Sequence, residues 1–387
     1  MTYMNGTRSS CTSVAVLAVT LILTACGPST PPQAQASPTD SASPQASPEV
    51  LFAVTEGIAL PSQPDTVAIV GLDGYSRAKA QFQPRTLPVV PDAYTPLQGV
   101  AQVAGSGVYY IDGAGTVRVL RVGSQPQIVA RFLLQPAQEN AWFAVSPDGS
   151  GAIAGVFTFP ALGPVIAGTS WNSLIGPSKF DLETAPAGGQ SKTLVHWESS
   201  VRFPGGASGP LFPVGWTSAG SVAMQPTDIS SQNAWPGGPL YVIDNSGKKT
   251  TQLGGSNCDS ASITPSGLIP CISGQSVTVR DQSGTVVWVT HVDSFSASSL
   301  SISPDGQAIS DGSHVEQRVG GMVGLGPQPA PNHFPGFRVE GWLDSTTVVG
   351  RIVIDDVHEG NLAWVNLSHP SVTHDLGFKG DFVATLG

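Results

Sequence analysis

The sequence predicts an all-β protein built from a repeated unit of short strands. Apolar or alternating runs of strand length recur between turns along most of its 387 residues, which is the pattern of half-buried strands. Glycine (45 residues) and proline (33 residues) are abundant, and no segment carries the apolar periodicity of an amphipathic helix. The turns also repeat in sequence, so we expect one structural unit to recur along the chain.

One repeated turn contains a proline and a glycine. Ser146-Pro147-Asp148-Gly149 and Ser303-Pro304-Asp305-Gly306 are identical, and Thr264-Pro265-Ser266-Gly267 is a variant. Proline presets φ at the first turn position, Asp or Ser fits the second, and glycine accepts a positive φ. Each turn follows a strand-like run, so the pattern predicts tight hairpins at these three places.

A second repeated element is an apolar strand that ends in Asp and leads to a glycine turn. Examples run from Leu240 to Gly247, from Val277 to Gly284 and from Tyr109 to Gly115. In alternation with the first turn, this element resembles the blades of TolB-type and other WD-repeat-like β-propellers. The resemblance implies that Ser-Pro-Asp-Gly joins the first two strands of a four-stranded blade and that the second element joins the last two. The WD dipeptide itself is absent.

The resemblance covers most of residues 49–387 and implies a single β-propeller. Blades of about 40 to 50 residues favour seven four-stranded blades over this length, although six or eight also fit. We expect the final run, Asp381 to Leu386, to pair with the N-terminal blade and close the ring, which leaves no long unpaired edge. A pair of β-sandwich domains is the alternative fold, but no linker is seen midway. The blade cores are expected near Val50, Val100, Trp142, Val214, Asn257, Ser299 and Gly341.

The N-terminal residues have the form of a removable signal segment. Val14 to Leu23 is an apolar run interrupted only by Thr20, too short for the roughly 20 residues that a membrane-spanning helix needs. Leu23-Thr24-Ala25-Cys26 follows and resembles the lipobox of bacterial lipoproteins. The resemblance implies that residues 1–25 are removed and that Cys26 carries a diacylglyceryl group with fatty chains such as palmitate. Two acyl chains anchor a protein stably. A secretory signal cut elsewhere, or a short anchor helix, is the alternative.

Residues 26–48 are expected to form the lipidated cysteine and a disordered linker. Gly27 to Pro48 contains six prolines, seven Ser or Thr residues and a single charge, Asp40. Such a segment buries too little apolar surface to offset its chain entropy. An extended proline-rich linker rises about 3.1 Å per residue, so it could hold a domain up to roughly 70 Å from a membrane. We therefore expect a bacterial protein that is lipid-anchored on the extracytoplasmic side of the cell membrane.

The charge balance restricts the partners. The chain has 27 acidic and 17 basic residues, a formal net charge of −10, and charged residues make up only 11%. An acidic surface with few Lys and Arg residues argues against nucleic acid and against electrostatic binding to anionic lipid. We expect a monomer that contacts the membrane through its lipid and binds a protein or a glycan of the cell envelope.

The two cysteines of the folded part are close in sequence. Cys258 and Cys271 lie in a compartment that is expected to be oxidising, so we expect one disulfide across a hairpin. A closed loop of this size contributes about 3 kcal/mol if the bond is unstrained. The segment offers too few further ligands for a structural metal site.

Three connections are too long for plain hairpins, and long ordered loops often carry function. They span Phe159 to Gln190, Pro226 to Pro239 and Gly320 to Arg338. By the strand order of the resembled family, all three lie on one face of the propeller. Exposed aromatic side chains there would suit sugar stacking or protein contact, whereas the alternative is that they pin the loops to the blades. The candidate aromatic and neighbouring residues are Trp171, Trp235, His333, Phe334 and Phe337, together with Phe180.

An acidic turn is expected on the same face. Asp355, Asp356, His358 and Glu359 lie between two strand-like runs. Carboxylates with a histidine could bind a divalent cation or act as acid and base, although hairpin loops are also polar for ordinary solvation reasons. A weaker group of the same kind comprises Asp311, His314 and Glu316.

We expect a binding or scaffold propeller rather than an enzyme. The sequence has no Gly-x-Ser-x-Gly elbow, no His-Glu-x-x-His motif and no phosphate-binding glycine loop, and it implies no cofactor. The alternative is a cell-envelope glycan hydrolase or lyase with its site at the mouth of the propeller channel. That chemistry requires two carboxylates in a concave site, or a histidine with acidic groups and a metal.

Overall fold

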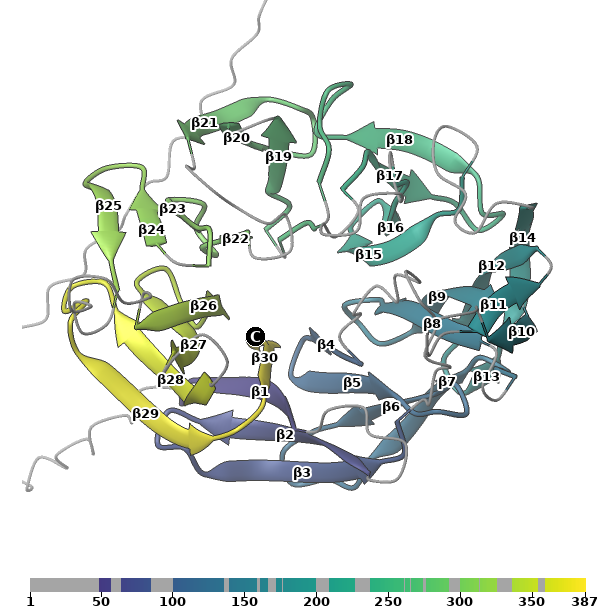
Figure 1. Cartoon of the computed structure of the whole chain (residues 1–387), viewed down its shortest axis with the longest axis horizontal. Coiled ribbons are helices and arrows are strands. Elements are labelled where there is room, and N and C mark those ends of the chain that lie inside the picture. The colour runs from purple at the N-terminus through teal and green to yellow at the C-terminus, as the bar shows by residue number, and fades with distance from the viewer. Residues whose placement is uncertain are drawn as a thin grey trace, which may run out of the picture. The chain divides into compact units, whose positions relative to one another are not determined.

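In the computed structural model, most apolar runs of the sequence pair as antiparallel strands with their chain neighbours. The resulting sheets form the seven blades of a β-propeller (Figure 1). This confirms the predicted fold class and the preferred blade number. No helix occurs among the residues that the structure describes. These are residues 49–56, 64–84, 100–135, 139–158, 161–165, 172–175, 177–199, 209–226, 237–260, 262–264, 266–273, 276–291, 300–312, 314–325, 336–353 and 359–387.

Blades 1 to 3 contain the first half of the strands and one inserted hairpin, β10–β11, between the second and third strands of blade 3. From the centre outwards, blade 1 is β30 (Asp381–Thr385), β1 (Leu51–Glu56), β2 (Asp65–Gly71) and β3 (Ser76–Phe82). Blade 2 is β4 (Ala101–Ala104), β5 (Gly107–Ile111), β6 (Thr116–Leu120) and β7 (Gln127–Arg131), with β13 (Gly189–Gln190) added at its outer edge. Blade 3 is β8 (Glu139–Val145), β9 (Gly151–Thr158), β12 (Ser178–Pro186) and β14 (Lys192–Ser199); the hairpin is β10 (Ala161–Val165) and β11 (Asn172–Ile175).

Blades 4 to 7 follow in chain order. Blade 4 is β15 (Phe212–Thr217), β16 (Gly220–Met224), β17 (Leu240–Ile243) and β18 (Lys249–Leu253). Blade 5 is β19 (Ile269–Ser273), β20 (Ser276–Arg280) and β21 (Val286–His291), with a single bridge from Asp259 to Ile272 in place of an inner strand. Blade 6 is β22 (Ser301–Ile302), β23 (Ala308–Ser310), β24 (His314–Gln317) and β25 (Gly321–Gly324); blade 7 is β26 (Phe337–Trp342), β27 (Thr347–Val353), β28 (Glu359–Asn366) and β29 (Thr373–Phe378).

The chain's last strand closes the ring, as the sequence predicts. β30 pairs antiparallel with β1, with Ala53 opposite Ala384. It is therefore the inner strand of blade 1, which explains why the position predicted near Val50 falls beside the second strand of its blade. Val100, Trp142, Val214 and Gly341 lie at or beside the inner strand of a blade, and Asn257 lies beside the bridged inner segment of blade 5. Ser299 lies outside the described residues. Closure joins the two ends of the propeller and pairs the edge of β1 that faces the centre.

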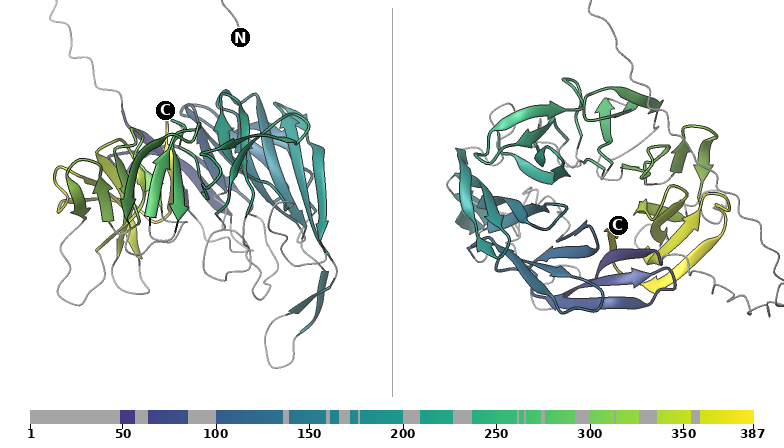
Figure 2. Two further views of the ribbon diagram at one scale, coloured as in Figure 1. Left: turned by 90° about the horizontal axis from the view of Figure 1, so that it is seen from above. Right: turned by 180° about the vertical axis from the view of Figure 1, so that it is seen from behind.

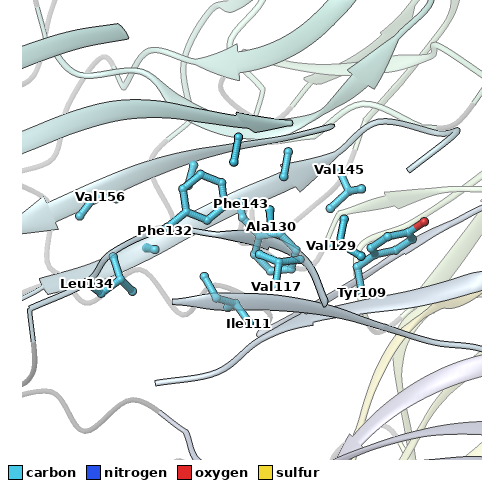
Figure 3. Close-up of a cluster of buried hydrophobic side chains, with 14 of the residues drawn as sticks. Tyr109, Ile111, Val117, Val129, Ala130, Phe132, Leu134, Phe143, Val145 and Val156 are labelled. Carbon is cyan, nitrogen blue, oxygen red and sulfur yellow. The ribbon is translucent and has the colours of Figure 1, made fainter. Parts of the chain in front are cut away.

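The cores of the propeller lie between neighbouring blades. Figure 3 shows the cluster between blades 2 and 3, where Val117 from β6 and Phe132 meet Phe143 from β8 and Val156 from β9. Strands between two blades bury both of their faces, which is why β2, β5 and β8 read as nearly continuous apolar runs. At about 25 cal/mol per Å², these shared interfaces supply the main stabilisation of the ring.

The Ser-Pro-Asp-Gly turns join the first and second strands of their blades, as predicted. In blade 3 the Ser146 hydroxyl donates to Asp148 Oδ1 (2.7 Å) and accepts from the Gly151 N–H (3.0 Å). Gly149 has a φ of 70°, and a Cβ there would lie 2.5 Å from the Tyr109 hydroxyl. The turn thus needs glycine both for its backbone and for the contact with blade 2.

The second repeated element joins the third and fourth strands in blades 4 and 5, as predicted. In blade 2 the prediction is wrong, because Tyr109 to Gly115 joins the second strand, β5, to the third, β6. The Asp112 carboxylate closes this turn by accepting from the N–H groups of Ala114 and Thr116. An Asp-to-Gly turn suits any tight hairpin. Its sequence therefore does not show whether it joins the second strand of a blade to the third or the third strand to the fourth.

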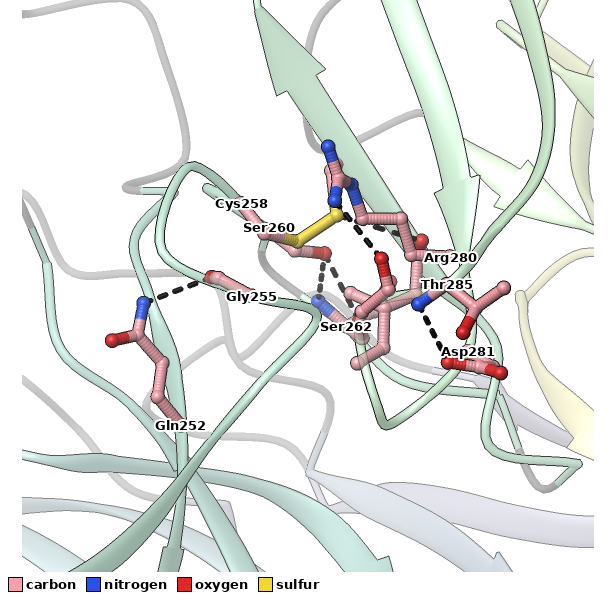
Figure 4. The surroundings of a disulfide bond; sticks show 11 residues. Gln252, Gly255, Cys258, Ser260, Ser262, Arg280, Asp281 and Thr285 are labelled. Atoms are coloured by element: carbon pink, nitrogen blue, oxygen red, sulfur yellow. Dashed lines mark hydrogen bonds between the residues drawn. A yellow bond between two sulfur atoms is a disulfide. The ribbon is translucent and has the colours of Figure 1, made fainter. Parts of the chain in front are cut away.

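A disulfide joins Cys258 to Cys271 in blade 5, with the Cα atoms 4.6 Å apart. Figure 4 shows its surroundings, in which the Ser260 hydroxyl donates to the Ser262 carbonyl (3.0 Å). Cys258 precedes Asp259 and Ser260, which form isolated bridges to Ile272 and Gly238, and Cys271 lies on β19. The bond therefore fastens a segment that has little strand pairing of its own.

The propeller has two different faces (Figure 2). On the loop face, the second strand of each blade leads to the third, and the outer strand leads to the next blade. On the turn face, tight hairpins join the first strand to the second and, in most blades, the third to the fourth. β1 begins and β30 ends at the turn face. None of the described residues forms a helix long and apolar enough to cross a membrane.

Candidate functional site

The three long connections predicted from sequence all leave strands at the loop face. The first and second join β9 to β12 and β16 to β17, which are second and third strands of blades 3 and 4. The third joins β25 of blade 6 to β26 of blade 7. The first is shorter than predicted, because β12 begins at Ser178, and the third is shortened at its start by β25. Trp171, Trp235, His333, Phe334, Asp355, Asp356 and His358 lie outside the described residues, as does Cys26.

Two of the predicted loop aromatics are core residues. Phe337 is fully buried as the first residue of β26, so it is not an exposed member of a binding face. Phe180 lies on β12 and packs against Trp197 and Phe212, with ring centroids 5.8 Å and 4.8 Å away. For Phe180 the prediction missed the whole of β12, which lies inside the predicted connection. For Phe337 it placed the start of β26 too late in the sequence.

Glu359 belongs to a charged network at the loop-face end of blade 7. Arg338 Nη2 donates to Glu359 Oε2 (3.0 Å), and Arg351 Nη1 lies 3.4 Å from the same oxygen. Arg351 also donates to Glu340 Oε1 (2.5 Å) and forms an ion pair with Asp381 on β30. Four of these five residues were missed from the sequence. Arg338, Glu340 and Arg351 lie on neighbouring strands of blade 7, and only ring closure brings Asp381 on β30 to them.

Glu340 is the most buried member of this network. Its side chain is 14% exposed, and its Oε2 accepts from the Phe382 N–H on β30 (2.8 Å). Burial raises the pKa of the Glu340 carboxyl, while the Phe382 N–H and the Arg351 guanidinium act in the opposite direction. Arg351 in turn donates to the Gly380 carbonyl (2.8 Å). The network therefore fastens the closing strand of blade 1 to blade 7.

The weaker predicted group, Asp311, His314 and Glu316, does not form one site: the first two residues belong to a turn, and Glu316 contacts the neighbouring blade. Asp311 Oδ1 accepts from the His314 N–H (2.7 Å), and its Oδ2 lies 3.6 Å from His314 Nδ1, which closes the turn between β23 and β24. The Glu316 carboxylate accepts from the Thr290 hydroxyl on β21 and links blade 6 to blade 5. These three residues thus have structural contacts and do not meet Glu359 in one site.

Among the residues that the structure describes, no group of three or more His, Cys, Asp or Glu residues is arranged to hold a metal ion. A pocket of about 260 Å³ lies between blades 3 and 4 on the turn face, next to Trp216 and Ser221. No residue predicted as part of a site lines this pocket.

The sequence matches no protein-family model and no curated protein. Solved structures resemble it at low identity. A TolB protein of Agrobacterium tumefaciens has 11% identity and a TM-score of 0.31, over 88% of this chain and 92% of that chain. An oligogalacturonate lyase in complex with manganese has 9% identity and a TM-score of 0.31, over 80% and 70%. The hydrazine synthase of Kuenenia stuttgartiensis has 16% identity and a TM-score of 0.38, over 72% and 79%.

These likenesses carry no argument about activity, because proteins with unrelated chemistry share this fold. The propeller is established by the strand pairing of the chain itself. Function must be argued from the two faces and their residues.

Proposed function

We propose that this protein is a membrane-anchored, extracytoplasmic binding or scaffold propeller that presents its loop face to a protein or glycan partner. The observation that carries the proposal is where the chain enters the ring. β1 begins at the turn face, and the proline-rich segment ends just before it. A tether held by a lipid on Cys26 thus joins the ring on the face opposite the long loops, which leaves the loop face open to a partner.

The strand ends that carry the loops of the loop face are held together by ion pairs, which suits a face that binds a partner. The Glu340–Arg351–Asp381 network holds the ends of three strands from two blades at this face. Leu133 on the link between blades 2 and 3 is 67% exposed, and Arg338 is half exposed. Loops carried on a rigid scaffold bind with less loss of conformational entropy than loops on a mobile one.

The lipid anchor is tested by replacing Cys26. We expect Cys26→Ser to move the chain from the membrane fraction to the soluble extracytoplasmic fraction, because the thioether can no longer form. The control is Cys11→Ser, which lies in the segment that is expected to be removed. Retention of the Cys26→Ser variant in the membrane would contradict the anchor.

Partner binding is tested on the loop aromatics. Trp171→Ala, Trp235→Ala and Phe334→Ala together should remove at least one partner from a cross-linked membrane pull-down of the full chain. Large aromatic side chains dominate the energy of interfaces, so a triple loss is expected to exceed tenfold in affinity. Val289→Ala is the control, because Val289 is an exposed apolar residue on β21 and is not one of the loop-face candidates. An unchanged set of partners would contradict the loop-face proposal.

A second candidate function is glycan hydrolysis or elimination at the channel mouth. The observation that favours it is Glu340, a buried carboxyl with a raised pKa beside the inner strand of blade 1. Raised pKa values are typical of general acids. The test is release of reducing ends or unsaturated products from envelope glycans by the purified chain. Activity that Glu340→Gln abolishes would support the enzyme, and absence of products from every glycan class would exclude it.

A further inference from the structure

Among the residues that the structure describes, exposed large apolar side chains lie mostly on the turn face. Each of five blades carries one such residue in or beside the turn between its third and fourth strands, at the outer rim of the ring. Val319 is the most exposed of them, at 86%, and Tyr75 follows at 71%. The blades concerned, 5, 6, 7, 1 and 2, are consecutive around the closed ring. We call these residues the apolar tips: Tyr75, Val122, Val286, Val319 and Val372.

Two of the tips share a local sequence. Arg121-Val122-Gly123 and Arg318-Val319-Gly320 occupy equivalent turns of blades 2 and 6. Both glycines have a positive φ, 74° and 124°, so the chain reverses directly after the valine. An arginine beside an exposed apolar tip suits an interface in which the tip enters an apolar layer while the guanidinium contacts phosphate above it.

The point at which the linker joins the ring indicates that the apolar tips contact the membrane. β1 begins at the turn face, so the linker joins the ring on the same face as the apolar tips. A tethered surface meets its membrane at a high effective concentration, so weak contacts suffice for docking. The net charge of −10 opposes general attraction to anionic lipid, and therefore the contact must depend on apolar insertion at the tips.

We infer that the apolar tips insert just below the phosphates, at the edge of the apolar layer, of the membrane that holds Cys26. This inference rests on the proposed lipid anchor and adds an orientation to it: the turn face lies on the lipid and the loop face points away. A single exposed valine is ordinary on a protein surface. Burial of one valine changes an equilibrium constant about tenfold, so several tips acting together produce a stable orientation.

The test measures the depth of single residues on a membrane. The full lipidated chain is placed on phosphatidylcholine vesicles with a nitroxide label on Val319→Cys or, as the matched position on the loop face, Leu133→Cys. We expect the label at 319 to be accessible to oxygen and protected from an aqueous nickel chelate, and the label at 133 to be fully accessible to the chelate. Equal chelate accessibility at both positions would overturn the inference.

A second set of variants separates docking from anchoring. Val122→Asp with Val372→Asp should raise chelate accessibility at 319 at least tenfold, because an ionised carboxylate is not accepted in the apolar layer. Val289→Asp is the control, since Val289 is exposed on β21 away from the turn. Both the double variant and the control should stay bound to the vesicles through the lipid. Dissociation on Cys26→Ser alone tests the anchor, whereas unchanged accessibility in the double variant overturns the docking.

Discussion

Glu340 and Arg351 are largely buried, where a charged group loses its hydration, but each has several hydrogen-bond or ion-pair partners. Each side chain is about one seventh exposed, at 14% and 15%. The carboxylate accepts from Arg351 and from the Phe382 N–H, and the guanidinium also contacts Glu359 and Asp381. Such a pair is fully satisfied only when blades 7 and 1 are in contact. Its main effect should therefore be specific closure of the ring rather than net stabilisation.

Removal of one partner should be strongly destabilising. We expect Arg351→Met to lower the free energy of unfolding by roughly 3 kcal/mol, because it leaves the Glu340 carboxylate buried without its cation. Urea unfolding of the variants measures this. Arg338→Met is the control, since Arg338 is about half exposed and should cost under about 1 kcal/mol. If adding Glu340→Gln to Arg351→Met recovered none of the loss, the buried pair would not be its cause.

Asp148 should make the Ser-Pro-Asp-Gly turn sensitive to acid. The Ser146 hydroxyl, followed by the Ser150 N–H, lowers the pKa of Asp148 to about 2 from an ordinary 3.8. A lowered pKa stabilises the fold above the ordinary value, and this stabilisation is lost as the pH falls through about 2. Thermal unfolding of Asp148→Asn should therefore show a lower midpoint than the parent at pH 7, with the difference shrinking below about pH 4.

The control for acid sensitivity is Asp40→Asn, which lies in the linker. It should leave the midpoint unchanged at each pH. Glu340 acts with the opposite sign, because burial raises its pKa and its contribution to stability falls as the pH rises above its ordinary value of 4.5. A pH-independent difference between Asp148→Asn and the parent would contradict the role given to Asp148.

Turns are the elements that the sequence predicts best. Ser-Pro-Asp-Gly has its turn chemistry within four residues. Its place between the first and second strands is implied by the resemblance to propeller blades. The position of a strand within its blade depends on pairing with distant segments and not on the residues of the turn. For this reason the sequence predicts the wrong strand pair for the turn from Tyr109 to Gly115. Phe180 and Phe337 were placed in loops because strand ends depend on the partner strand and not on apolar pattern alone.

Glycine at the Ser-Pro-Asp-Gly turn should be required for two reasons. Gly149→Ala combines a positive φ with a Cβ 2.5 Å from the Tyr109 hydroxyl. Gly188→Ala has nearly the same φ, 72°, but no atom lies within 4 Å of its added Cβ. We expect about 1 kcal/mol for Gly188→Ala and a clearly larger loss for Gly149→Ala in urea unfolding. Equal losses would mean that backbone strain alone accounts for the glycine.

At the scale of the whole molecule, closure by β30 is the event that makes the ring. Deletion of residues 381–387 should raise amide exchange in β1 and β26 far more than in β16 and β20, which lie in blades 4 and 5. The Thr385 hydroxyl, which donates to the Trp342 carbonyl (2.8 Å), offers a milder control as Thr385→Val. That variant should cost about 1 kcal/mol. A uniform rise in exchange would show that closure is not local to blades 7 and 1.

The candidate site is less predictable from sequence than the fold. Glu359 could be selected because it follows two acidic residues in a turn. Arg338, Glu340 and Arg351 could not, because charged residues in strands usually face solvent, and the contacts of Arg351 with Asp381 and of Glu340 with the Phe382 N–H need the closed ring. The tether entry on the turn face likewise follows only from the order in which β30 and β1 pair.

The central claim is that the loop face binds a partner while the turn face lies toward the membrane. A photo-cross-linking residue at position 133 on the loop face, or at position 319 on the turn face, tests it in the full membrane-held chain. The account predicts a discrete protein or glycan adduct from position 133 and lipid adducts from position 319. A protein or glycan adduct formed from position 319, with none from position 133, would contradict it.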